Sequence, residues 1–213
     1  MTIEIKSLTL GMVATNCYLV GDTETGEALV IDPVDRADII FQAAEESGWS
    51  IELILATHGH FDHVLASKDL KAQTGAPFYI HAADTLFLDA LPQIGIQYTG
   101  QPFPEAAKPD RLLTDETEII ELGAIRLETI FTPGHAPGHI SFYMREHQVV
   151  FSGDCLFAGS IGRTDLPGAD HDQLMRSIRD KLLPLGDEVQ VLPGHMETTT
   201  IGQERRTNPF LTR

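Results

Sequence analysis

The chain has 213 residues, of which 42% are hydrophobic, and we expect residues 1–213 to form a single domain around one core. Its 31 acidic residues against 15 Lys and Arg give a formal net charge of −16, which argues against general nucleic-acid binding and against docking on anionic lipid. Apolar runs such as residues 51–56 are far shorter than the roughly 20 residues that span a bilayer.

The N-terminal stretch alternates like a strand, with Glu4 and Lys6 among its apolar residues, and it lacks the layout of a signal peptide. Cys17 and Cys155 could form at most one disulfide. Because no secretion signal is seen, we expect free thiols in a cytoplasmic protein, either a monomer or a small homo-oligomer.

Strand and helix signals alternate in the first half of the chain. Strands are predicted at 2–10, 13–21, 26–32, 51–56 and 78–80. Helices are predicted at 36–47, 63–73 and 82–91, and a polar loop at 57–62. Asp35 is the expected N-cap of the first helix, while Gly48 and Gly75 should end the first and second helices.

Proline and glycine over residues 92–117 predict a long surface connection without long regular structure. Within it, residues 92–110, with Tyr98 and Phe103, could rim a substrate cleft or form a plain loop. Further strands are predicted at 118–122, 124–131, 140–145, 148–152 and 189–192. Helices follow at 171–183, capped by Asp170 with Gln173, and near 198–206. This order indicates an α/β fold with two mixed sheets and helices outside them.

The strongest chemical signal is the segment Thr57–His63, which holds three His and one Asp between a buried strand and a helix. Neutral imidazole and carboxylate suit Zn²⁺, Fe²⁺ or Mn²⁺. His58 and His60, two residues apart at a strand end, can project toward one ion, and Asp62 and His63 can reach a second. The segment therefore predicts a metal centre.

Three later residues, each preceded by glycine, follow predicted strands and are candidate ligands: His135, Asp154 and His195. Glycine permits the tight backbone that aims such a side chain into a crowded site. Four ligands in one segment cannot fill the coordination of two ions, which strengthens the case for these three.

The Thr-His-x-His-x-Asp-His motif, followed in order by His135, Asp154 and His195, resembles the metallo-β-lactamase superfamily over nearly the whole chain. Within it the chain is most similar to glyoxalase II, the hydroxyacylglutathione hydrolases, in their short single-domain bacterial form; the segments after Asp154 and at 204–210 carry this likeness. The resemblance implies a four-layer αββα sandwich, with two mixed β-sheets flanked by helices.

The resemblance also implies the ligand roles. One divalent ion would be held by His58, His60 and His135, and the second by Asp62, His63 and His195. Asp154 would bridge them, and Asp32 after the strand at 26–32 would support the site without touching metal. Two Zn²⁺ ions are expected, with Fe or Mn as alternatives.

The expected reaction is thioester hydrolysis by a hydroxide between the ions, which metal can generate near neutral pH. Asp62 and Asp154 are the catalytic carboxylates of this hypothesis. A thiolate leaves readily and needs little acid assistance. The leading substrate is S-lactoylglutathione, giving glutathione and D-lactate in the detoxification of methylglyoxal.

Full-length glyoxalase II carries a C-terminal helical domain that binds glutathione; because only 18 residues follow His195, we expect none here. Arg163 could hold a substrate carboxylate or pair with Asp165. His139 is interpreted as structural, through a loop hydrogen bond, and Cys155 as a packed small residue. The alternative function is a mononuclear iron persulfide dioxygenase using His58, His135 and Asp154; an exported lactamase and an RNA-processing nuclease are disfavoured.

Overall fold

The computed structural model describes residues 3–212, and within them the chain divides into two compact units. The first unit runs to Leu113 and includes Glu121–Ile125; the second comprises Thr114–Ile120 and the chain from Arg126 onward. The prediction of one domain over 1–213 stays a prediction.

The first unit contains a six-stranded mixed sheet with strand order β1-β2-β3-β4-β5-β6 within the described residues. Its strands are β1 (Ile3–Leu10), β2 (Thr15–Asp22), β3 (Glu27–Ile31), β4 (Ser50–Leu55), β5 (Phe78–His81) and β6 (Arg111–Leu113). Its helices are α1 (Ala37–Glu46), α2 (Phe61–Val64), α3 (Ser67–Thr74) and α4 (Thr85–Thr99), with a 3₁₀ turn at Ala82–Asp84.

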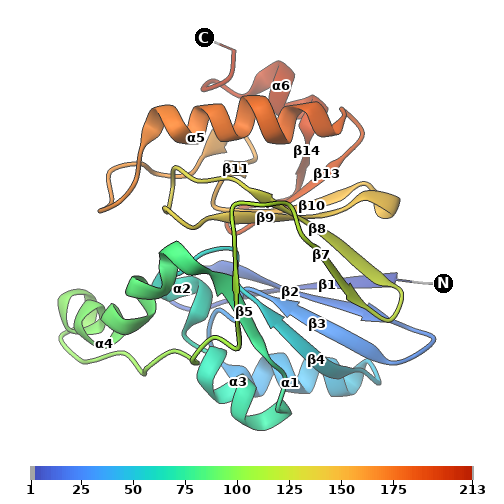
Figure 1. The fold of residues 1–213 in the computed structure, drawn as a ribbon, viewed down its shortest axis with the longest axis vertical. Coiled ribbons are helices and arrows are strands. Elements are labelled where there is room, and N and C mark those ends of the chain that lie inside the picture. Colours follow the sequence, from blue (N-terminus) through green and yellow to red (C-terminus); the bar gives the residue numbers. More distant parts are fainter. Residues whose placement is uncertain (1–2, 213) are drawn as a thin grey trace. The chain divides into compact units, whose positions relative to one another are not determined.

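In the first unit α1 and α3 cover one face of the sheet (Figure 1). Ile40 of α1 and Leu70 of α3 are fully buried in one apolar cluster with Val30 and Ile54 of the sheet. Burying one such side chain contributes about 1.5–3 kcal/mol. The pairings β3–β4, β4–β5 and β5–β6 are parallel, so the carboxyl ends of these strands share one edge.

In the part of the chain that the structure describes, a second sheet has the order β14-β13-β10-β9-β8-β7, and all of it belongs to the second unit except Glu121 and Leu122 of β7 and Ile125 of β8. Its strands are β7 (Ile119–Leu122), β8 (Ile125–Phe131), β9 (Ile140–Met144), β10 (Val149–Gly153), β13 (Gln190–Pro193) and β14 (Thr199–Thr200). A small hairpin is formed by β11 (Leu156–Phe157) and β12 (Ser160–Ile161). Helices α5 (His171–Ser177) and α6 (Ile201–Thr207) lie on one face of this sheet (Figure 1).

The strand directions of the second sheet bring three carboxyl ends to one edge. β10 pairs in parallel with β13, and β8 and β10 each pair antiparallel with β9, so β8, β10 and β13 run the same way. Residues that directly follow these strands therefore share one edge, as in other sheets with parallel strands.

Several predicted boundaries are confirmed. The strand expected at 2–10 is β1, although residue 2 lies outside the described residues. Gly48 and Gly75, with φ of 73° and 74°, follow α1 and α3 as expected. Asp170 caps α5 by accepting a hydrogen bond from the Gln173 N–H at 2.8 Å.

The helix predicted at 171–183 has an apolar face, because Leu174, Ile178 and Leu182 are fully buried. The helix is not α-helical throughout. A π-helical turn at Ile178–Leu182 follows α5, and a 3₁₀ turn at Leu183–Leu185 ends it.

The prediction of Asp35 as an N-cap is wrong. The N-cap of α1 is Arg36, in the left-handed region at φ 54°, and no side chain caps the helix. Asp35 instead accepts a hydrogen bond from the Arg36 N–H at 2.7 Å. The carboxylate is therefore used in the turn that precedes the helix.

The helix predicted at 63–73 is two helices, α2 and α3, and the first begins at Phe61. The break follows from one backbone contact: the Ala66 N–H donates to the carbonyl of Pro33 at 3.0 Å and so leaves the helical pattern. Asp62 and His63 consequently lie on a short helix.

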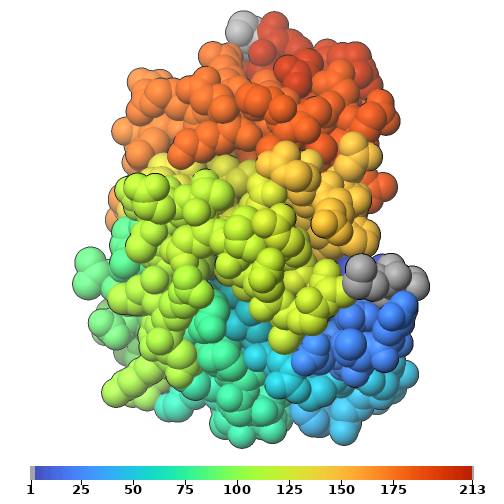
Figure 2. Space-filling model, turned by 45° about the vertical axis from the view of Figure 1, so that its right-hand side comes forward, coloured from blue at the N-terminus to red at the C-terminus, as the bar shows by residue number. Residues whose placement is uncertain are grey.

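The connection predicted at 92–117, without long regular structure, is wrong at its start, where α4 continues to Thr99. Further along it contains only the short strand β6 (Arg111–Leu113). Pro92 removes one helical hydrogen bond, but Leu91 is fully buried and the returning chain lies against Gly95, where an added Cβ would be 2.1 Å from the Phe103 nitrogen. This packing outweighs the local signal of proline. Most of residues 101–110 are exposed, and the segment lies at the surface (yellow-green in Figure 2).

Candidate metal-binding site

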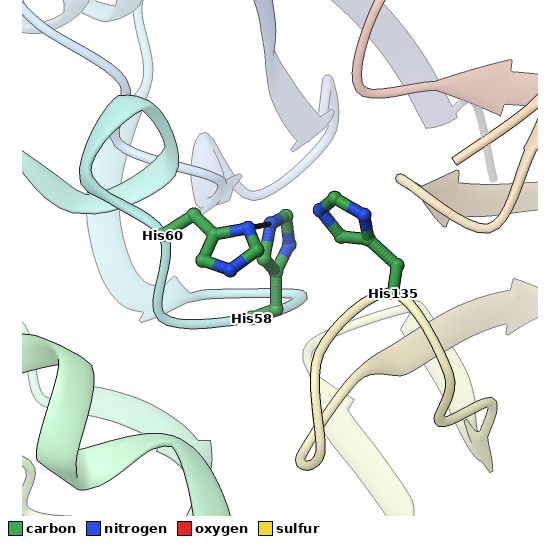
Figure 3. A group of neighbouring side chains, drawn as sticks. All are labelled: His58, His60 and His135. Carbon is green, nitrogen blue, oxygen red and sulfur yellow. Dashed lines mark hydrogen bonds between the residues drawn. The ribbon is translucent and has the colours of Figure 1, made fainter. Parts of the chain in front are cut away.

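In the first unit the four clustered candidate ligands follow β4. His58 and His60 lie on the loop between β4 and α2, and Asp62 and His63 lie on α2. Figure 3 shows His58 and His60 on this loop, joined by the dashed hydrogen bond between His58 Nε2 and His60 Nδ1 at 3.0 Å. The rings of His58 and His63 lie with centroids 4.1 Å apart. The motif thus gathers its imidazoles in one place.

Asp32, buried at the end of β3, organises this group. Its carboxylate accepts hydrogen bonds from the Thr57 N–H at 2.7 Å, from the Thr57 hydroxyl at 2.9 Å and from His63 Nδ1 at 2.9 Å. A carboxylate can only accept, so His63 Nδ1 carries the proton and the lone pair lies on Nε2. This orientation is the one a histidine needs to bind metal through Nε2.

Thr57 fixes the protonated ring nitrogen of His58 in the same way. Its hydroxyl proton goes to Asp32, so its oxygen accepts from His58 Nδ1, 3.0 Å away. The lone pair of His58 therefore also lies on Nε2. Sequence reasoning gave Thr57 no role, although its place at the head of the motif was visible.

Two further contacts fix the loop and α2. The Gly59 N–H donates to the buried carboxylate of Asp84 at 2.9 Å, and a Cβ on Gly59 would lie 2.7 Å from the Asp84 carbonyl. Asp62 Oδ2 accepts from the Thr15 hydroxyl at 2.9 Å and lies 3.6 Å from His63 Nε2. Sequence analysis missed Asp84, because nothing in the chain near residue 84 points to a loop 25 residues away.

In the second unit the three remaining candidates lie at the shared strand edge, after β8, β10 and β13. Figure 3 shows His135 on the loop that follows β8. Asp154 Oδ2 lies 3.4 Å from His135 Nε2 and 3.5 Å from His195 Nε2. His135 Nδ1 donates to the carbonyl of Arg163 at 2.8 Å, which puts its lone pair on Nε2. Both imidazoles thus present Nε2 toward one carboxylate oxygen.

These separations suit metal ligation. The Nε2–Oδ2 distances of 3.4, 3.5 and 3.6 Å exceed ordinary N–H···O hydrogen bonds. Two ligand atoms on one tetrahedral zinc, each bonded at about 2.0–2.1 Å, lie about 3.3 Å apart. The candidate ligands, five histidines and two aspartates, offer imidazole and carboxylate donors, which are the types that fit a divalent first-row ion.

Gly162 packs tightly against the backbone of Asp154, where only a residue without a side chain fits. An added Cβ there would lie 1.9 Å from the Asp154 carbonyl oxygen and 3.2 Å from His135 Cβ. Because the nearest atom is backbone, no side-chain movement could relieve the overlap. The sequence analysis gave Gly162 no role and so missed this steric one.

The other residues noted in the sequence behave as ordinary structure. Arg163 forms a two-point ion pair with Asp165, with both N–O distances at 2.7 Å, and this holds the pKa of Asp165 at about 2. Cys17 and Cys155 are free and buried, as expected for thiols outside a disulfide. His81 caps a 3₁₀ turn.

The sequence of residues 10–195 matches the family model described as the metallo-beta-lactamase superfamily. The chain belongs to this superfamily. It is 42% identical over 212 residues to the hydroxyacylglutathione hydrolase GloC of Haemophilus influenzae, covering 99% of this chain and 98% of that protein. The family match and the identity to this relative together support the prediction that the chain is a hydrolase.

Two solved structures are similar to the chain over nearly its whole length. The BLEG-1 B3 metallo-beta-lactamase superposes with a TM-score of 0.92 at 38% identity, over 99% of this chain and 100% of that one. TTHA1623 in a di-iron-bound form gives 0.87 at 39% identity, over 97% and 100%. With the two mixed sheets and their helices, they confirm the predicted fold class. No helix within residues 3–212 combines the length and apolar character needed to cross a membrane.

Proposed function

We propose that this protein hydrolyses glutathione thioesters, with S-lactoylglutathione as the leading substrate. The observation that carries the proposal is the 42% identity, along nearly the full length of both chains, to a protein named hydroxyacylglutathione hydrolase. The products would be glutathione and D-lactate, in the detoxification of methylglyoxal in the cytoplasm.

The proposal assigns seven ligands. His58, His60 and His135 would hold one divalent ion, and Asp62, His63 and His195 the other, with Asp154 shared between them. Three observations support this assignment. The side chains have the donor chemistry of metal ligands, they include groups of three His or Asp residues that could hold an ion, and the chain belongs to the superfamily. Zn²⁺ is the proposed metal, while the di-iron form of TTHA1623 makes iron the first alternative to test.

When bound, a pair of divalent ions would supply a strongly nucleophilic water near neutral pH and polarise the thioester carbonyl. The chain's own residues determine whether those ions sit correctly. Asp32 and Thr57 set the lone pairs of His63 and His58, and the Arg163 carbonyl sets that of His135. The thiolate product needs little proton donation, so the absence of a dedicated acid from this residue set is consistent with a thioester.

The identity of the thiol rests on the relative rather than on a recognised glutathione contact in this chain. Arg163 was one candidate for a substrate carboxylate, and its guanidinium is paired with Asp165. A substrate panel therefore tests glutathione recognition directly.

The test is a panel of four measurements on one metal-loaded preparation: thiol release from S-lactoylglutathione, thiol release from an acyl thioester of another thiol, oxygen uptake with glutathione persulfide, and hydrolysis of a chromogenic β-lactam. The proposal expects the first to dominate. Oxygen uptake with persulfide as the main activity would instead establish the iron dioxygenase, and β-lactam turnover as the main activity would establish a lactamase.

Variants connect the activity to the site. His58→Ala and Asp154→Ala should abolish thioester hydrolysis with the fold retained by circular dichroism. His147→Ala is the matched control, since this histidine is exposed and lies in a 3₁₀ turn outside the ligand set. Full activity in either ligand variant would refute the assignment.

A further inference from the structure

His139 is a buried histidine whose two ring nitrogens both make hydrogen-bonding contacts within the second unit. Its side chain is fully buried, on the loop that also carries His135. Its Nδ1 lies 2.8 Å from the Thr132 hydroxyl, and its Nε2 lies 3.0 Å from the backbone nitrogen of Asp154. The ring thus joins the strand end at β8 to the strand end at β10.

The contact with Asp154 determines which ring nitrogen carries the proton. A backbone N–H can only donate, so Nε2 of His139 must accept and cannot carry a hydrogen. A neutral ring then has its proton on Nδ1, which donates to Thr132 Oγ1. The geometry therefore selects one tautomer of His139.

Two buried hydroxyl groups, of Thr132 and Ser141, continue the hydrogen-bond chain that begins at His139 Nδ1–H. Thr132 Oγ1, accepting from His139, lies 2.9 Å from Ser141 Oγ, to which it can donate. Ser141 Oγ in turn donates to the carbonyl of Ser152 at 3.5 Å. Thr132, Ser141 and Ser152 are all fully buried, so the order of donors is sheltered from water.

Backbone hydrogen bonds also hold the loop between Thr132 and His139. The Thr132 N–H donates to the His139 carbonyl at 2.9 Å, and the His139 N–H donates to the Ala136 carbonyl at 3.4 Å. The His135 and His139 rings stand edge-on with centroids 6.4 Å apart. Movement of His139 would therefore disturb both His135 and Asp154.

We propose that His139 is a positioning residue: held by Thr132 as the Nδ1–H tautomer, it accepts the Asp154 N–H and so sets the position of the Asp154 carboxylate relative to His135. The metal consequence of this inference rests on the ligand role proposed above for Asp154. Hydrogen-bonding partners of metal ligands typically change metal affinity by about 10- to 100-fold when they are removed.

The tautomer is tested directly by long-range ¹H–¹⁵N spectra of the histidine rings in zinc-loaded, ¹⁵N-labelled protein, with the His139 signals assigned by their loss in His139→Gln. We expect the Nδ1–H pattern in the wild type and, in Thr132→Val, a clear shift of the His139 Nδ1 and Hδ1 signals, because that proton loses its acceptor. An Nε2–H pattern for His139 in the wild type would overturn the inference.

The consequence for the site is measured as zinc affinity by competition with a chromophoric chelator. Thr132→Val should weaken the affinity by about 10- to 100-fold, while Thr132→Ser, which keeps the hydroxyl, should restore it. Thr129→Val is the matched control. Thr129 is also buried, and its hydroxyl accepts from the Glu118 N–H at 2.7 Å, away from His139. His139→Gln, which keeps an acceptor, should bind zinc more tightly than His139→Leu.

The two proposals fail in different ways. If Asp154→Asn binds zinc like the wild type, the ligand role of Asp154 is wrong, and the ring spectra alone decide the tautomer of His139. If Asp154→Asn loses zinc while Thr132→Val and His139→Leu bind it as tightly as Thr129→Val does, the positioning role of His139 is wrong and the ligand assignment stands.

Discussion

Asp32 accepts a hydrogen bond from His63 Nδ1 at 2.9 Å, and both side chains are buried. The same carboxylate accepts from the backbone and the hydroxyl of Thr57, whose oxygen accepts from His58. One carboxylate on β3's end therefore sets the orientation of two candidate ligands on the segment after β4. The two strands are parallel neighbours, which is why residues 31 positions apart meet.

Asp32→Asn should weaken metal binding by about 10- to 100-fold, because an amide cannot accept from Thr57 and His63 with both of its terminal atoms. The measurement is zinc affinity by chelator competition, with the melting temperature recorded alongside. Asp69→Asn is the control, since Asp69 is an exposed carboxylate in the same unit. Equal affinities for the two variants would show that Asp32 does not support the site.

Gly162→Ala should disrupt the packing of the backbone against Asp154, since the new methyl group would lie 1.9 Å from the Asp154 carbonyl oxygen. We expect a large loss of soluble, metal-binding protein. Gly159→Ala tests the alternative that any glycine in this region is sensitive: its Cβ would meet nothing within 4 Å, and only its φ of +68° is unfavourable, at about 1–2 kcal/mol. The account is contradicted if Gly162→Ala is the more stable of the two.

Both cysteines should resist alkylation in the native protein. Burial raises the pKa of the Cys17 and Cys155 thiols well above their ordinary value, and the thiolate is the reactive form. Titration with a colorimetric thiol reagent at pH about 8 should detect almost no thiol before unfolding and two per chain in denaturant. Rapid reaction of Cys155 in the native state would show that the region beside Asp154 opens.

The sequence predicted most of what depends on local pattern and on contiguous motifs. The strands, the glycine stops after α1 and α3 and the Asp170 cap were visible because each depends on neighbours in the chain. The continuation of α4 through Pro92 was not, because it depends on packing against Phe103.

The candidate ligands were likewise easier to predict than the residues that hold them in place through hydrogen bonds. The four residues of the motif stand within six positions, whereas Asp84 and Thr132 act through hydrogen bonds to Gly59 and His139. A structural role for His139 was expected, and its hydrogen bonds confirm that role. Its partner, the Asp154 N–H, depends on strand order and could not be read from spacing.

Arg163→Met should leave the Michaelis constant for S-lactoylglutathione within about threefold of wild type, because Arg163 is committed to an exposed pair with Asp165, and such pairs contribute little. The pKa of Asp165 is lowered to about 2, so the pair stays ionised as pH falls until that value is approached. The pH dependence of activity between about pH 5 and 9 should therefore be the same in Asp165→Asn and wild type. A tenfold rise in the Michaelis constant for Arg163→Met would instead assign Arg163 to substrate binding.

The most direct test of the central claim is elemental analysis of the purified protein, before and after chelation, together with thioester hydrolysis by the same samples. The account predicts up to two divalent ions per chain in the wild type and markedly less metal in His58→Ala and His195→Ala. It also predicts that activity is lost on chelation and returns with added zinc or iron. Undiminished hydrolysis by protein shown to contain no metal would contradict the account.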